Sequence, residues 1–427
     1  MRLASLAVLI SSTWLSGQVR TANTPDFEPV DSGPRIDTLK QRLLSGDRNS
    51  LNEFWRDFGR AGTPLVEPVK GSSTKVVVTF LWRGGPGTYS VGLLAPRENV
   101  PRMPYFPLRR LHSTDVWYKS WQVRDDLRFG YRFVLNMKPG EEYRQQETID
   151  PLDPDQLDVA FDEEQPTTRF SIAGMPRGQD PKWITKQAGI PNGRVERHRF
   201  KSAILTNERA IWVYTPPGYE RAKREYHLLV LFDGFAYQNW IPVPTILDNL
   251  IHAGQLAPMI AVFIGNAPGS RVKELQYNPQ FVDFVAKEIM PWVYEQWKVT
   301  RDPQKTIIGG YSLGGAASAF IAMEHPELFG NVLSQSGSFQ EGHKDRKWEW
   351  LASQYDAHPK LPIKFFMEAG RLEDVSVDGP ALLAANRHLV SVLRNKEYSV
   401  TYEEVGGTHE PAHWRGEFAK GLTSLAK

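Results

Sequence analysis

The hydrophobic pattern of the chain first predicts a domain of short strands. From Lys75 onward, runs of β-branched and aromatic residues recur between glycine and proline turns, without a helical stretch. Short strands at this spacing are typical of an immunoglobulin-like β-sandwich of about 100 residues. The expected strands lie at 76–82, 89–94, 116–123 and 130–135.

From about residue 196 the pattern changes to an alternation of strands and helices. Apolar residues at helical spacing predict helices that include 279–297 and 313–325. Such alternation builds a mostly parallel sheet covered on both faces, so the fold class is α/β, preceded by the smaller sandwich. The expected strands are 210–214, 227–232, 259–264, 306–309, 332–336, 363–368 and 399–405.

These patterns divide the chain into five segments. Met1-Arg2, an apolar run over 3–15 and Ser16-Gly17-Gln18 resemble a secretory signal, and the run is too short to span a bilayer. We therefore expect a periplasmic or secreted protein, with the cytoplasm as the alternative. The segments are a possible signal peptide (1–18), a linker (19–50), the sandwich (51–138), an interdomain connection (139–195) and the α/β domain (196–427).

Composition excludes several classes of protein. The 51 basic and 49 acidic side chains give a net charge of +2, which argues against a nucleic-acid partner. The absence of cysteine excludes disulfides, thiolate nucleophiles and cysteine metal sites. No stretch beyond the N-terminal run is long and apolar enough to be a membrane span.

The strongest chemical signal is the sequence Gly310-Tyr311-Ser312-Leu313-Gly314. The motif Gly-x-Ser-x-Gly is weak evidence by itself, but here a predicted strand enters it and a predicted helix leaves it. That strand–turn–helix context is the one a nucleophile elbow requires, with small residues that let strand and helix approach closely around a strained serine. The sequence therefore predicts an α/β-hydrolase fold for this half of the chain, with Ser312 as the nucleophile of an esterase.

A serine nucleophile needs a base, and the base needs a carboxylate to orient it. In this fold the chain order is serine, acid, histidine. His409 follows the expected strand 399–405 and a Gly-Gly turn, so it is the favoured base, with His413 as its rival. Glu373 lies just beyond the expected strand 363–368 and is the favoured acid, although Asp374 also qualifies.

The oxyanion of an ester intermediate needs two backbone donors. One is the N–H of Leu313, which follows the nucleophile and begins a helix with its favourable dipole. The other is expected in the loop Leu231-Phe232-Asp233-Gly234-Phe235, with the N–H of Phe235 as the first choice. The alternative for Asp233-Gly234 is an ordinary turn.

One competing motif points to zinc. His409-Glu410-Pro411-Ala412-His413 matches the H-E-x-x-H pattern of zinc proteases. That chemistry places both histidines on one face of a continuous helix, whereas Pro411 is tolerated only in a first turn. We therefore expect no metal site.

The sequence resembles the enterochelin (enterobactin) esterase family, within the esterase-D-like hydrolases. The catalytic half matches in Leu231-Phe232-Asp233-Gly234, Gly310-Tyr311-Ser312-Leu313-Gly314-Gly315, Leu333-Ser334-Gln335-Ser336-Gly337-Ser338, Glu368-Ala369-Gly370 and Gly406-Gly407-Thr408-His409 continuing to Trp414-Arg415. The front half, which simple esterase-D hydrolases lack, matches in Phe54-Trp55, Gly62-Thr63-Pro64-Leu65-Val66-Glu67, Phe80-Leu81-Trp82-Arg83, Thr114-Asp115-Val116-Trp117 and Asp150-Pro151-Leu152-Asp153-Pro154.

The resemblance also bears on the triad. The family acid lies three residues beyond Glu-Ala-Gly, which is Glu373. The family pattern reads Gly-Gly-His, whereas Thr408 is inserted here. Counting back from Trp414 still places the family's histidine at His409.

The resemblance implies hydrolysis of the trilactone ester bonds of a catecholate siderophore, with release of iron. The partner is then a small-molecule siderophore, and no cofactor is expected beyond the iron in the substrate. A ferric tris-catecholate is anionic, so basic groups near the mouth of the site are expected to bind it. Arg271, at the carboxyl end of the sheet, is the candidate, and the alternative is a surface arginine. Asp233 and Gly234 are the other expected substrate-binding residues. Aromatic residues such as Trp82, Tyr237 and Trp240 either stack on catechol rings or pack in the core.

Two other functions stay open at the level of sequence. The first is a carbohydrate esterase acting on acetyl or feruloyl groups, with the sandwich as a binding module; an exported protein would favour it. The second is a catalytically inactive ligand-binding protein. Turnover of the two kinds of ester distinguishes a carbohydrate esterase from a siderophore esterase. Labelling of Ser312 by a fluorophosphonate distinguishes both from a binding protein.

Overall fold

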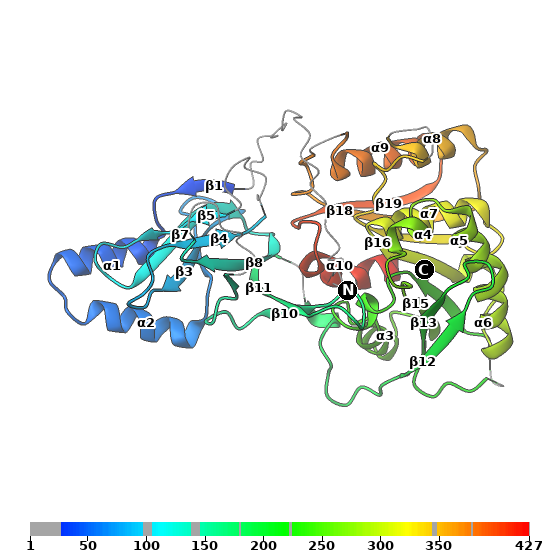
Figure 1. The fold of residues 1–427 in the computed structure, drawn as a ribbon, viewed down its shortest axis with the longest axis horizontal. Coiled ribbons are helices and arrows are strands. Elements are labelled where there is room, and N and C mark those ends of the chain that lie inside the picture. Colours follow the sequence, from blue (N-terminus) through cyan, green and yellow to red (C-terminus); the bar gives the residue numbers. More distant parts are fainter. Residues whose placement is uncertain are drawn as a thin grey trace, which may run out of the picture.

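The computed structural model describes residues 27–96, 105–137, 146–178, 181–221, 224–343, 348–376 and 379–426. Within these ranges the chain forms a strand-rich N-terminal domain and an α/β C-terminal domain (Figure 1). The expected signal peptide, 1–18, lies outside the described residues, so export stays a prediction. In the described part of the chain, every helix is too short or too polar to cross a membrane.

Two antiparallel sheets form the N-terminal domain. The sides that face each other enclose a core that contains Phe80, Trp121, Phe129 and Tyr131. The first sheet has the order β1 (Phe27–Val30), β7 (Val116–Arg124), β3 (Lys75–Arg83), β2 (Leu65–Pro68), with β6 (Arg109–Arg110) on β7. The second has β10 (Gln156–Val159), β11 (Thr168–Gly174), β8 (Arg128–Leu135), β4 (Val91–Leu94), β5 (Phe106–Pro107), with β9 (Glu147–Thr148) on β8.

The strands of this domain extend beyond the segment 51–138 in which the sequence pattern indicated them. The segment 19–50, expected as a linker, contributes β1 and helix α1 (Pro34–Leu44). The segment 139–195, expected as an interdomain connection, contributes β9, β10 and β11. The register of these strands is set by pairing with β7, β8 or each other, which a local hydrophobic pattern does not reveal.

Two helices cover the outer face of the first sheet. They are α1 and α2 (Ser50–Ala61), at the far end of the molecule from the C-terminal domain in Figure 1. Ile36, Phe54 and Phe58 pack against Leu81 and Tyr118 of the sheet. The outer face of this sheet is therefore covered by the two helices and is not exposed to solvent.

The C-terminal sheet has eight strands, of which only β13 runs against the others. This order is that of the α/β-hydrolase fold, as the sequence predicted. Strand β12 was not among the expected strands; it is rich in charged residues and has no apolar run. The order is β12 (Arg194–Lys201), β13 (Glu208–Thr215), β15 (Met259–Ile264), β14 (His227–Leu231), β16 (Thr306–Tyr311), β17 (Asn331–Gln335), β18 (Lys364–Gly370), β19 (Ser399–Val405).

Helices cover both faces of this sheet. On one face lie α3 (Val243–His252) and α10 (Pro411–Leu425). On the other lie α4 (Arg271–Leu275), α5 (Pro279–Asp283), α6 (Met290–Gln296), α7 (Leu313–Glu324), α8 (Trp350–Ala357) and α9 (Leu382–Asn395).

The helix predicted over 279–297 is interrupted by a π-helical turn. The turn, η4, spans Phe284–Ile289 between α5 and α6. Pro291, in the first turn of α6, has no N–H to donate backward, so the regular hydrogen-bond ladder cannot run through this point.

Candidate active site

Ser312 lies in a sharp turn between strand β16 and helix α7. Its backbone angles are φ 55° and ψ −125°, a conformation that non-glycine residues rarely adopt. A Cβ on Gly310 would lie 2.5 Å from the carbonyl carbon of Gly314, so a larger residue there would push the strand and helix apart. The turn is further held by the N–H of Ser312, which donates to Gln335 O at 2.9 Å. This is the geometry of a nucleophile elbow.

Ser312, His409 and Glu373 form a continuous line of hydrogen bonds. Nε2 of His409 lies 2.8 Å from Oγ of Ser312, and Nδ1 lies 3.0 Å from Oε1 of Glu373. A carboxylate accepts only, so Nδ1 carries the proton and Nε2 of the neutral ring accepts from the serine hydroxyl. The loop after β18 therefore carries the predicted acid, and the loop after β19 carries the predicted base.

The two alternative triad residues take other positions. Asp374 follows Glu373 in the same loop. Glu404 raises the pKa of Arg387, and the negative charge of Asp374 adds to this effect. His413 is fully buried, with Nδ1 2.8 Å from the carbonyl oxygen of Thr408 and Nε2 on Oε2 of Glu368. Burial alone would lower the pKa of His413, but the Glu368 carboxylate raises it to about 9. His413 is thus a buried cation beneath the loop that carries His409.

The same contacts bear on the H-E-x-x-H motif. His409 meets Ser312, whereas His413 meets Glu368, and Oε1 of Glu410 accepts from the N–H of Gly130 at 2.7 Å. The three side chains therefore point to different partners. Within the described ranges, no three His, Asp or Glu side chains gather to hold a metal ion.

The N–H groups of Leu313 and Phe235 are the predicted donors of an oxyanion hole. Leu313 is the first residue of α7, where a helix leaves its N–H groups without an intrahelical acceptor. Phe235 follows the turn at the end of β14, whose residue Asp233 has a φ of 54°. Among the described residues neither N–H has a protein acceptor. Their role in catalysis stays a prediction.

Arg271 and Asp233, predicted to bind substrate, bind each other. Nε and Nη2 of Arg271 lie 2.6 and 2.7 Å from the two oxygens of Asp233, which also accepts from Asn266 at 2.6 Å. Asp233 is only 1% exposed, and although burial lowers the pKa of Arg271, the Asp233 carboxylate raises it by more. The N–H of Gly234 donates to Ile264 O at 2.9 Å. These contacts hold the loop that carries Phe235.

Two residues near the triad were not singled out from the sequence. Oγ of Ser338 lies 3.2 Å from Oγ of Ser312, and the ring of Trp414 stands edge-on to that of His409 at 4.9 Å. Trp414 also stacks on Tyr311 at 4.4 Å. Both belong to motifs quoted above for the family resemblance, but only the geometry places them beside the triad.

Of the three aromatic residues considered for stacking on catechol rings, two are fully buried and Trp82 is half-buried against the sandwich core. Tyr237 and Trp240 are 0% and 2% exposed. Trp82 packs against Phe133 in the sandwich at 5.3 Å. These contacts agree with the alternative that the three aromatic residues pack in the protein interior.

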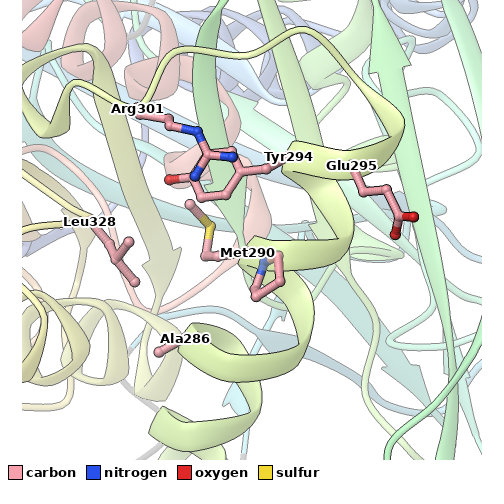
Figure 2. A pocket seen from close by; sticks show the side chains of 7 residues that line it. Ala286, Met290, Tyr294, Glu295, Arg301 and Leu328 are labelled. Atoms are coloured by element: carbon pink, nitrogen blue, oxygen red, sulfur yellow. The ribbon is translucent and has the colours of Figure 1, made fainter.

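A surface hollow of about 360 Å³ lies elsewhere on the C-terminal domain. Figure 2 shows its lining, which comes from the π-helical turn, α6 and the loops before β16 and after α7. These segments meet the amino ends of the strands, whereas Ser312 is at the carboxyl end of β16. The hollow is therefore separate from the triad. Its lining residues are Ala286, Met290, Pro291, Tyr294, Glu295, Arg301 and Leu328.

Two family models match the chain. The family described as "Putative esterase" matches residues 202–425, about half of the chain, and "Enterochelin esterase, N-terminal" matches residues 77–183. The iron(III) enterobactin esterase of Escherichia coli O6:H1 is 27% identical over 381 residues, covering 82% of this chain and 90% of that protein. The iron(III) enterobactin esterase of Dickeya dadantii is 27% identical over 437 residues, with 90% and 94% covered.

Solved structures agree with this grouping. The ferric enterobactin esterase of Salmonella typhimurium superposes with a TM-score of 0.73 at 25% identity, covering 88% of this chain and 98% of that one. The enterobactin esterase of Shigella flexneri, determined in the presence of enterobactin, gives 0.72 at 27% identity, with 87% and 97% covered. Both domains are therefore shared, and the chain belongs to the enterochelin esterase family of α/β-hydrolases.

Proposed function

We propose that this protein is a serine esterase that cleaves the ester bonds of a catecholate siderophore of the enterobactin type and so releases its iron. One observation carries the proposal. Relatives named for iron(III) enterobactin esterase activity align over both domains, including the N-terminal domain that simple esterases lack. The hydrogen-bonded line from Ser312 to Glu373 supplies the chemistry such a reaction needs.

The first half of the reaction acylates Ser312. Oγ attacks the carbonyl carbon of a seryl ester while Nε2 of His409 takes the hydroxyl proton. Glu373 stabilises the resulting imidazolium from the Nδ1 side. The N–H groups of Leu313 and Phe235 are the proposed donors to the tetrahedral oxyanion.

His409 then gives its proton to the leaving seryl oxygen, which opens the lactone ring and completes the acyl-enzyme. In the second half, the neutral imidazole of His409 takes a proton from a water molecule that attacks the acyl carbonyl. It returns this proton to Oγ of Ser312 as the acyl bond breaks, so the product leaves as the acid and Ser312 is again a hydroxyl. Repeating the cycle on the remaining esters of the linear product yields smaller fragments, which hold iron with fewer catecholates each.

In this scheme the protein needs no cofactor of its own, and iron is cargo in the substrate. Turnover of a small iron-free ester tests this point, since a chelator cannot act there by stripping the substrate. Activity on such an ester that survives dialysis against a chelator supports the proposal. Loss of activity that zinc restores would support the metal alternative instead.

A substrate comparison tests the proposed function. The purified chain is given ferric enterobactin, iron-free enterobactin and a feruloylated xylan oligosaccharide, and products are separated by liquid chromatography and identified by mass. We expect the linear trimer and shorter seryl fragments from enterobactin, with kcat/KM far above that for the feruloyl ester. The reverse preference would make the chain a carbohydrate esterase. No turnover of any ester, together with failure of a fluorophosphonate to label Ser312, would indicate a binding protein.

We also propose that the protein is exported, on the basis of the basic start and apolar run of residues 1–15 followed by small residues. The N-terminus of the protein recovered from the periplasm or medium, determined by mass spectrometry, tests this. Recovery of the uncleaved chain from the cytoplasm would favour the alternative location.

A further inference from the structure

The loops that carry Glu373 and His409 are bonded to each other. The N–H of Leu372 donates to Gly407 O at 3.1 Å, and the N–H of Arg371 donates to Val405 O at 2.9 Å. The acid and the base of the triad therefore sit on one double loop at the carboxyl ends of β18 and β19. Whatever holds this double loop also sets the position of the His409 ring.

The N-terminal domain touches the double loop through its backbone. The N–H of Arg128, at the start of β8, donates to Gly406 O at 2.7 Å. A Cβ on Gly406 would lie 2.1 Å from the carbonyl oxygen of Asp126, so the approach of the two domains requires glycine at this point. Gly406 lies three residues before His409.

Glu410, the residue after His409, makes a second contact. It occupies the position before helix α10, where a carboxylate commonly accepts from the N–H groups of its own helix. The side chain makes no such cap here. Oε1 instead accepts from the N–H of Gly130 in β8 at 2.7 Å.

Arg371 makes a third contact, from the acid side of the double loop. Its Nη2 donates to Oδ1 of Asp126 at 2.7 Å, and its Nη1 donates to Glu404 O at 3.2 Å. Asp126 is itself held by Arg124 at 3.1 and 3.0 Å. Burial raises the pKa of Asp126, but Arg124 and Arg371 lower it by more, so the carboxylate stays charged at neutral pH.

Apolar packing joins the domains around these contacts. Leu372, between Arg371 and Glu373, packs against the core of the sandwich. In the other direction, Leu157 and Val159 of β10 and Ile172 of β11 belong to the buried cluster of the C-terminal domain under α3 and α10. The contacts with the double loop are therefore part of a packed interface.

We propose that the N-terminal domain positions the catalytic triad: β8 and the Asp126 turn hold the double loop through Glu410 and Arg371, in addition to any part the domain has in binding substrate. The inference rests on the serine triad of the proposed function, but not on the siderophore as substrate. Catalytic geometry is sensitive enough for this to matter, since a displacement of about 1 Å can cost about 10²-fold in rate.

The test uses the full chain and two substrates, p-nitrophenyl acetate and enterobactin. The small neutral ester carries none of the groups of a siderophore, so its kcat reports the triad and not contacts made to a large substrate. We expect Glu410→Ala and Arg371→Ala to lower kcat on both esters by about 10-fold or more, with KM for p-nitrophenyl acetate unchanged. Glu410→Gln keeps an acceptor for the Gly130 N–H and should recover most of the rate.

Matched variants separate positioning from stability. Arg177→Gln removes an exposed arginine from a carboxylate next to Asp126, without a contact to the double loop, and should leave kcat unchanged. Asp126→Ala combined with Arg371→Ala should cost no more than the worse single change, because the two residues act as one pair. Melting temperatures of all variants are measured alongside.

Two results would overturn the proposal. If kcat on p-nitrophenyl acetate stays within twofold in Glu410→Ala and Arg371→Ala, the N-terminal domain does not position the triad, whatever happens to the KM for enterobactin. If Glu410→Gln fails as badly as Glu410→Ala and both melt early, the contact serves folding alone. If the native chain cleaves the small ester but no siderophore, the proposed substrate is wrong and this inference is still tested.

Discussion

Oε1 of Glu373 lies 3.0 Å from Nδ1 of His409, and Oε2 of the same carboxylate accepts from the N–H of Gly370 at 3.0 Å. The side chain is 2% exposed, so both oxygens are fixed by protein donors away from water. This fixes the orientation of the imidazole and the nitrogen that carries its proton. The neutral ring therefore presents Nε2 as a base to Ser312.

The first prediction concerns that carboxylate. Glu373→Gln should lower kcat by about 10²- to 10⁴-fold, because an amide cannot stabilise the imidazolium and can favour the wrong tautomer. Asp374→Asn is the matched control and should change kcat by no more than a few-fold. Steady-state kinetics on p-nitrophenyl acetate measure both. A larger loss in Asp374→Asn would assign the acid to the neighbouring residue.

The second prediction concerns Arg271. Arg271→Ala leaves the buried carboxylate of Asp233 without its cation and should reduce the free energy of unfolding by about 3–5 kcal/mol. Arg271→Lys keeps the charge but loses the two-pronged contact, so its loss should be smaller. Denaturant unfolding measures the effect. Unchanged stability with a raised KM for ferric enterobactin would instead mean that Arg271 serves the substrate, as the sequence suggested.

The third prediction concerns His413, whose pKa is raised to about 9 in the folded chain by Glu368. A raised pKa means that the folded state binds the extra proton more tightly than the unfolded state, whose value is near 6.5. This stabilisation is complete below about pH 6.5 and is lost as the pH rises toward 9, at up to about 1.4 kcal/mol per pH unit.

The measurement is the free energy of unfolding of the native chain and of a His413→Gln/Glu368→Gln variant, at several pH values between 6 and 9.5. The double change removes both charges of the buried pair and so supplies the reference. The difference between the two proteins should shrink by roughly 3 kcal/mol across this range. A difference that does not vary with pH would show that His413 is neutral in the fold.

The α/β half of the fold followed closely from the sequence, because each of its central strands is an apolar run flanked by turn residues. Strand β12, with the sequence Arg-Val-Glu-Arg-His-Arg-Phe-Lys, has no such run, since it lies at the edge of the sheet. Strand β10 is four residues long and is defined by its pairing with β11. Such strands depend on distant partners and leave little local pattern.

For the candidate site, the sequence supplied chain order and loop position, which narrowed the acid and the base to two residues each. Only the structure brings Glu373 and His409 into contact and places His413 on Glu368. The bond between Gly130 and Glu410 joins residues 280 positions apart, and no local pattern predicts it. The ion pair between Arg271 and Asp233 was not predicted either, because the two residues lie 38 positions apart in the sequence.

The central claim is that Ser312 is the nucleophile that opens the siderophore lactone. Its most direct test is the kcat/KM of the native chain and of Ser312→Ala on ferric enterobactin, with circular dichroism and melting temperature to show that the variant is folded. We predict that the folded variant loses activity by about 10³-fold or more. A folded Ser312→Ala protein that still produces the linear trimer at a rate near that of the native chain would contradict the claim.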